Sequence, residues 1–167
     1  MKKKNYKVGD KIVELGQVFK IFKIKKVKDS NGDLGRAIFF KPYYPTKQIA
    51  SLVCSIPIKN IEKTKIREPI SQKEFEQLIK RLSDKKNLEE FPAINKAKEL
   101  LKSSNPADTV EVIKTFCKEK ENSENFSKSK KDIFNLAMEN LVEEFALVSK
   151  ASLEEARKKI QLALRSQ

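Results

Sequence analysis

The 167-residue chain contains no histidine, no tryptophan and only four glycines. Without histidine, it lacks the commonest general base and the commonest metal ligand of proteins. The four glycines match neither common phosphate-binding fingerprint, so a glycine-rich nucleotide loop is not expected. Cys54 and Cys117 have no histidine partner and no CxxC spacing, which argues against both a catalytic thiol and a zinc site.

Three pairs of neighbouring carboxylates remain as candidates for acid–base chemistry. They are Glu89/Glu90, Glu143/Glu144 and Glu154/Glu155. Adjacent positions on a helix point about 100° apart, so we interpret these pairs as solvated helix faces rather than as a catalytic dyad. The sequence therefore predicts a binding protein without enzymatic activity, cofactor or metal.

Long apolar segments are also missing. The longest runs, such as SLVCSIPI, are far shorter than a membrane span, and no apolar segment follows the charged start MKKKNYKVGD. We therefore expect a cytoplasmic protein with no membrane partner. In such a compartment Cys54 and Cys117 are predicted to be reduced core residues. A monomer is the expected state, although the apolar runs do not bear on it.

Positive charge is what the chain has in excess. The formal net charge is +13, with a pI near 9.6. Residues 1–68 carry 17 Lys/Arg against 6 Asp/Glu (+11), and residues 69–167 carry 19 against 17 (+2). This balance favours a polyanionic partner, with nucleic acid first and an acidic protein surface second. A merely solvated, lysine-rich surface is the simpler alternative.

Residues 1–68 have the pattern of β-strands. The strand-like segments are GDKIVEL, VFKIFKIKKV, RAIFF and ASLVCSIPI, with a possible fifth at IEKTKIR. Strict alternation in the second segment would mix lysine with apolar residues on both faces, which predicts a bulge or a twist. The segment DSNGDLG after it predicts a hairpin turn. Short strands of this kind favour a small, strongly bent β-barrel of the SH3 or Tudor type.

From residue 69 onward the apolar residues follow helical spacing. Ser71 with Glu74 and Ser152 with Glu155 form capping boxes, and Asn105 precedes a proline at the first helical position. We predict an α+β protein in which residues 1–68 form the β-domain and residues 69–167 form a compact bundle of four to five helices.

Five segments along the chain resemble the CarD family of bacterial transcription regulators. They are YKVGDKIV, IPIKNIE, REPISQKEFEQLIKRL, LLKSSNPADTVEVIKTF and FSKSKKDIFNLAMENLVEEFALV. The last two follow the family's helical pattern without a gap. The order and spacing of all five extend the resemblance over residues 6–164.

The resemblance implies that residues 1–68 form a Tudor-like domain that binds the β subunit of RNA polymerase. In the family this domain lays a strand against a sheet edge of the polymerase. The matching segment here is LVCSIP, with Val53 and Ser55 expected in the strand. The family often has an arginine at the position of Ser55. The basic residues that could compensate, or that could instead guard an edge strand against aggregation, are Lys23, Lys25 and Lys26.

The resemblance also implies that residues 69–167 bind promoter DNA at the upstream edge of the transcription bubble. In the family, basic side chains contact the DNA backbone and a tryptophan wedge in the minor groove stabilises the open complex. Alignment through LLKSSNPAD puts Glu90 at the tryptophan position, so the neighbouring Phe91 is either a weaker wedge or a core or cap residue. The basic candidates are Lys96, Lys98, Lys102, Lys128, Lys130 and Lys131, each with a solvated surface role as its alternative.

The leading hypothesis is thus a transcription regulator that binds the polymerase β subunit and double-stranded promoter DNA, the latter mostly through the DNA backbone. Two alternatives stay open. One is a polymerase-bound adaptor whose helical domain meets a protein partner. The other is a Tudor-like RNA-binding protein whose basic β-domain contacts RNA directly.

Overall fold

The computed structural model describes residues 5–28, 32, 34–84, 93–122 and 126–165. The chain divides into two compact units, which are described separately. The first, the sheet unit, comprises residues 1–14 and 18–69; the second, the helical unit, comprises residues 15–17 and 70–167. Among the described residues, no helix has the length and hydrophobicity needed to cross a membrane.

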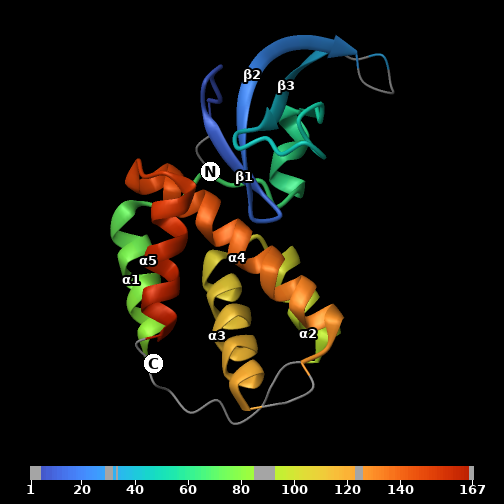
Figure 1. Cartoon of the computed structure of the whole chain (residues 1–167). Coiled ribbons are helices and arrows are strands. Elements are labelled where there is room, and N and C mark those ends of the chain that lie inside the picture. Colours follow the sequence, from blue (N-terminus) through green and yellow to red (C-terminus); the bar gives the residue numbers. More distant parts are fainter. Residues whose placement is uncertain (1–4, 29–31, 33, 85–92, 123–125, 166–167) are drawn as a thin grey trace. The chain divides into compact units, whose positions relative to one another are not determined.

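Four antiparallel strands follow one another across the sheet unit. They are β1 (Lys11–Glu14), β2 (Gln17–Lys28), β3 (Leu34–Pro42) and β4 (Cys54–Pro57), in the order β1-β2-β3-β4. The long strand β2 bends strongly over its length (Figure 1). Its register against β3 shifts between Ile21 and Lys23, so of the two predicted irregularities, a bulge or a twist, the pairing shows a bulge. The predicted turn DSNGDLG lies partly outside the described residues, but the antiparallel pairing of β2 with β3 confirms the hairpin.

One face of this sheet is apolar. Phe19, Ile21, Ile38 and Phe40 are buried there, and the rings of Phe19 and Phe40 meet edge to face with centroids 5.3 Å apart. Because successive strand residues point to opposite faces, Lys20 and Lys41 lie on the other face, which we call the outer face. The sheet unit therefore has one core face and one face that carries lysines.

Two strand predictions are corrected by the structure. The segment IEKTKIR is not a fifth strand, because residues Ile58–Lys63 form a 3-10 helix, η1, and only Arg67 makes a β-bridge, to Val13. Residues three apart are eclipsed in such a helix, so Ile58 and Ile61 both face the core. The strand expected over ASLVCSIPI begins only at Cys54, so Val53 lies just before β4 rather than within it.

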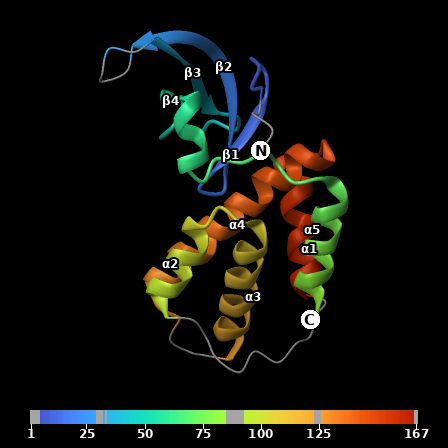
Figure 2. The ribbon, with the colours of Figure 1, turned by 180° about the vertical axis from the view of Figure 1, so that it is seen from behind.

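Five helices form the second unit. They are α1 (Gln72–Ser83), α2 (Ile94–Lys102), α3 (Pro106–Asn122), α4 (Lys128–Ser149) and α5 (Leu153–Arg165). The central helix α4 contacts the other four, while α1 lies beside α5 and α2 beside α3 (Figures 1 and 2). Phe75 of α1 stacks on Phe145 of α4 with ring centroids 4.3 Å apart. The α+β class and the helical bundle are thus confirmed.

The predicted helix starts are confirmed by their capping bonds. Ser71 and Glu74 form a reciprocal capping box at α1. Ser152 and Glu155 repeat it at α5, where hydrogen bonds from the Ser152 backbone N–H and hydroxyl lower the pKa of the Glu155 carboxyl. The side chain of Asn105 accepts the Ala107 N–H at 3.0 Å at the start of α3.

The carboxylate pairs differ from one another. Glu154 and Glu155 are exposed as predicted, and Glu89/Glu90 lies outside the described residues. The prediction for Glu143 and Glu144 is wrong, because both are buried in α4. Glu144 accepts the backbone N–H of Ile70 at 3.0 Å, so burial of this acid is offset by a bond that sequence spacing does not reveal.

Candidate functional site

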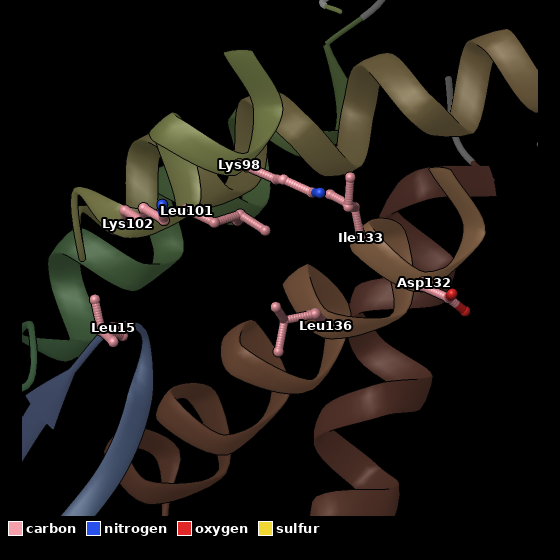
Figure 3. Close-up of a pocket in the computed structure, with 7 residues that line it drawn as sticks. All are labelled: Leu15, Lys98, Leu101, Lys102, Asp132, Ile133 and Leu136. Carbon is pink, nitrogen blue, oxygen red and sulfur yellow. The ribbon is translucent and has the colours of Figure 1, made fainter. Parts of the chain in front are cut away.

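An apolar groove of about 300 Å³ lies between α2 and α4 of the helical unit (Figure 3). It is lined by Leu15, Lys98, Leu101, Lys102, Asp132, Ile133 and Leu136. The side chains of Leu101 and Leu136 lie across the groove from each other in Figure 3. Leu136 is 54% exposed, so its side chain is accessible from the groove.

Two of the predicted DNA-binding lysines lie at this groove. Lys98 and Lys102 are four residues apart on α2, so they share one side of the helix, and both are exposed. Between them Leu101 is buried, and Ala97 packs inward before Lys98. The short helix α2 thus fixes an apolar floor and a positively charged rim on adjacent positions.

The turn Leu15–Gln17, which belongs to the helical unit, closes one end of the groove through Leu15. It is held by two hydrogen bonds. The Gly16 N–H donates to Ser104 Oγ at 3.3 Å, and Asn140 Nδ2 donates to the carbonyl of Leu15 at 3.2 Å. Gly16 has φ +85°, and a Cβ at this position would lie 2.4 Å from Asn140 Nδ2. Only glycine therefore fits here without rearrangement.

Gly16→Ala is accordingly expected to lower the free energy of unfolding of the helical unit by about 2–5 kcal/mol. About 1–2 kcal/mol comes from the left-handed backbone and about 1–3 kcal/mol from overpacking against Asn140. Urea unfolding followed by circular dichroism measures the change. Gly9→Ala, with φ +100° and open space, isolates the backbone cost, and Gly35→Ala, with neither problem, is the neutral control. Equal effects of all three substitutions would contradict the close packing.

The other lysines of α2 and α4 differ in their surroundings. Lys96 pairs with Glu99 at 4.0 Å, but both side chains are largely exposed, so the pair contributes little. Lys130 forms a partly buried ion pair with Glu119, and its ammonium lies 5.9 Å from the Phe116 ring centroid. Lys128 and Lys131 flank it and are exposed. Of these three lysines, Lys130 is thus already paired with a residue of the same unit, whereas Lys128 and Lys131 are exposed.

Phe91, the possible wedge, lies outside the described residues. Its role stays a prediction that depends on the alignment alone.

In the sheet unit, β3 connects the predicted polymerase-binding residues. Phe39 of β3 pairs with Lys23 on one side and with Ser55 on the other, which places Lys23 and Ser55 in one row across the sheet. Lys25 lies two residues further along the same face, and Lys26 points to the opposite face. Lys23, Lys25 and Ser55 therefore share the outer face.

Two exposed apolar residues lie just before the edge strand β4, Leu52 at 39% and Val53 at 57% exposed. Strand β4 pairs with β3 and stands last in the sheet, so among the described strands none pairs with its other edge. Leu52 was not among the sequence candidates, although its position next to Val53 could have indicated it.

The two cysteines are free thiols, partly buried in the two units. Burial raises the pKa of the Cys54 thiol, and the nearby Glu14 carboxylate raises it further. Burial also raises the pKa of Cys117, with a smaller contribution from Glu121. Both thiols therefore stay protonated at neutral pH, the state of an inert cysteine.

Sequence reasoning missed most of the groove. Leu15 lies more than a hundred residues before Asp132 and Leu136 in the sequence. One signal was available: Leu136 lies beside, and not on, the apolar stripe of α4 that contains Ile133 and Ala137. An apolar residue outside its helix's stripe is predicted to be exposed, although a single such residue does not by itself mark a contact surface.

The model of the C-terminal domain of CarD matches residues 77–161, just over half of the chain. The chain belongs to the CarD family. No curated protein matches it significantly. The matched range includes the whole of α2, α3 and α4, and hence the lysine-rimmed groove except for Leu15.

The CarD family consists of non-enzymatic, transcription-associated factors. Among the residues that the structure describes, no three or more His, Cys, Asp or Glu lie close enough together to hold a metal ion.

Proposed function

We propose that the protein regulates transcription by binding the RNA polymerase β subunit through its sheet unit and promoter DNA through its helical unit. It contacts the upstream edge of the bubble and stabilises the open complex. The family match over residues 77–161 is the observation that carries this proposal.

The features of the sheet unit support the polymerase contact. The open edge of β4 offers backbone groups to a partner strand, while Leu52 and Val53 offer apolar surface beside it. Lys23 and Lys25 lie on the outer face, in register with the β4 residues across β3. Backbone pairing at this edge gives affinity, and the lysines attract an acidic patch.

The features of the helical unit support a DNA contact without base-specific readout. Lys98 and Lys102 project from one side of α2, and Lys128 and Lys131 lie exposed in the first turn of α4. Lysines are flexible point charges that bind phosphate, not base edges. Cations at a helix N-terminus are disfavoured by the helix dipole, so the α4 pair gains from an added polyanion.

Open-complex lifetime tests the proposal. Purified bacterial polymerase forms open complexes on a promoter, and a competitor then traps dissociated enzyme with and without the full-length protein. We expect the wild-type protein to lengthen the lifetime of the open complex. We expect the double variant Lys98→Gln with Lys102→Gln to lengthen it less. Lys73→Gln with Lys80→Gln on α1 removes the same charge elsewhere on the helical unit and serves as the control. If wild-type protein leaves the open-complex lifetime unchanged while still binding the β subunit, the proposed DNA role is rejected.

The apolar groove favours one second candidate, the adaptor. Its lining of leucine and isoleucine is suited to an apolar side chain from a protein, and only its rim is charged. In that case the helical unit would bind a protein while the sheet unit stays on the polymerase.

A further inference from the structure

Two exposed aromatic rings stand on the outer face of the sheet unit, each with a lysine over it. Phe22 is 36% exposed, and Lys41 Nζ lies 5.7 Å from its ring centroid. Tyr43 is 37% exposed, and Lys11 Nζ lies 5.2 Å from its centroid. Alternating aromatic and basic side chains on a sheet form the kind of surface on which bases stack and phosphates bind.

The backbone places these residues together. Tyr43 lies one residue beyond the end of β3, in a bend, and its N–H donates to the carbonyl of Val18 at 2.9 Å. Lys11 adjoins the core residue Ile12 in β1 and therefore lies on the outer face, so the contact of its ammonium with the Tyr43 ring places that ring beside this face. The ring of Tyr44 meets that of Tyr43 at 77° with centroids 4.8 Å apart, which steadies Tyr43 from the side.

The lysines of this face have an unfavourable arrangement in the isolated chain. Lys20 lies directly opposite Lys41 in the antiparallel register. Like charges directly opposite each other destabilise a sheet. Among the described residues, neither lysine forms an ion pair that would offset the repulsion. An anion bound between them would remove it.

We propose that this face binds single-stranded nucleic acid, with one base stacked on Phe22, another on Tyr43, and phosphates against Lys20 and Lys41. The ring faces distinguish this ligand from two others. A duplex hides its base faces in the stack, and an acidic peptide pairs with the lysines but makes no use of the rings. The site goes beyond the proposed function, which assigns these four residues no role.

Fluorescence anisotropy with a labelled short oligonucleotide, as single-stranded DNA and as single-stranded RNA, tests the site on the full-length protein. Stacking of one base on an aromatic ring changes affinity by about 5- to 150-fold. Phe22→Ala with Tyr43→Ala is therefore expected to weaken binding by at least about 25-fold. Phe22→Tyr with Tyr43→Phe keeps both rings and is expected to retain binding. Leu34→Ala, at an exposed apolar residue of β3, is the control.

Because the chain has no tryptophan, a single substitution provides a local reporter. Phe22→Trp is expected to bind the oligonucleotide and to lose fluorescence as a base stacks on the new indole. Leu162→Trp places the same reporter on an exposed position of α5 and is expected to show no quenching. Quenching of both reporters alike would contradict a defined stacking site.

The charges are tested separately. Each phosphate contact on a single strand contributes about 0.7 to the slope of log affinity against log salt, so Lys20→Gln with Lys41→Gln is expected to reduce that slope by about 1.4. Three results would overturn the proposal. Wild-type protein could fail to bind single strands at low salt. Lys98→Gln with Lys102→Gln could abolish the binding, which would assign it to the helical unit. Third, Phe22→Ala with Tyr43→Ala could weaken binding of the β subunit while leaving oligonucleotide binding unchanged, which would make this face a protein contact.

Discussion

Replacing Leu52 and Val53 together by alanine is expected to weaken binding of the protein to the polymerase β subunit by about 30- to 150-fold. The side chains are 39% and 57% exposed beside the open edge of β4, so a partner strand would cover them. Truncating each loses about 1–1.5 kcal/mol of apolar burial, or about 2–3 kcal/mol for both. Backbone pairing at the edge is unaffected by the substitution, so residual binding is expected.

The measurement is a titration of the isolated β subunit with the full-length protein. Leu34→Ala is a stringent control, because Leu34 is 70% exposed and lies on β3, yet it pairs with Lys28 at the far end of the sheet from β4. If Leu34→Ala weakens binding as much as the double variant does, the contact is spread over the sheet and the β4 edge is not its centre. If neither variant changes the affinity, this edge does not meet the β subunit.

The parts of the fold that follow local rules could be predicted from the sequence. Ser71 and Ser152 mark helix starts because their hydroxyls bond to backbone groups within the same turn. Such bonds depend only on neighbouring residues, so a short motif predicts them. The alternation of lysine with apolar residues along β2 likewise predicted a half-buried strand, and its imperfect pattern predicted an irregularity, a bulge or a twist.

The errors have two causes, local turns that leave no periodic pattern and contacts between residues far apart in the sequence. Val53 was expected within a strand, but hydrogen bonds from Ile49 to Thr46 and from Leu52 to Ile49 keep the preceding segment in turns. Glu144 was expected in solvent, but the backbone of Ile70, 74 residues away, supplies its partner. The periodicity of apolar residues along the sequence gives no information about turn hydrogen bonds or about contacts between distant residues.

The candidate site shows the same division. The lysines of α2 were found because basic residues are visible in a sequence, whereas their neighbour Leu15 joins the groove only through the turn fixed by Gly16 and Asn140. Lys130 was chosen on the same grounds as Lys128, but its pairing with Glu119 from α3 separates the two. Charge alone therefore indicated a surface, and tertiary contacts decide which of its members are available.

The second large effect is expected on the affinity for DNA, through the lysines of α2 that the fold leaves exposed. Replacing Lys98 and Lys102 by glutamine is expected to reduce the slope of log affinity against log salt by about 1.8 for duplex or forked promoter DNA, because each phosphate contact contributes about 0.9. The same relation gives an affinity loss of about 60-fold near 0.1 M salt. Since phosphate contacts ignore sequence, the loss should be equal on unrelated DNA.

Lys130→Gln is the internal comparison, because its charge is already paired with Glu119. It is expected to change the salt slope by much less than one phosphate contact and to destabilise the helical unit instead. Leu136→Gln separates the two proposed roles of the groove. A DNA contact through the rim lysines tolerates this change, whereas an adaptor that inserts an apolar side chain between α2 and α4 does not. If wild-type protein binds no DNA at low salt while still holding the β subunit, the rim lysines have another purpose and the adaptor becomes the better account of the helical unit.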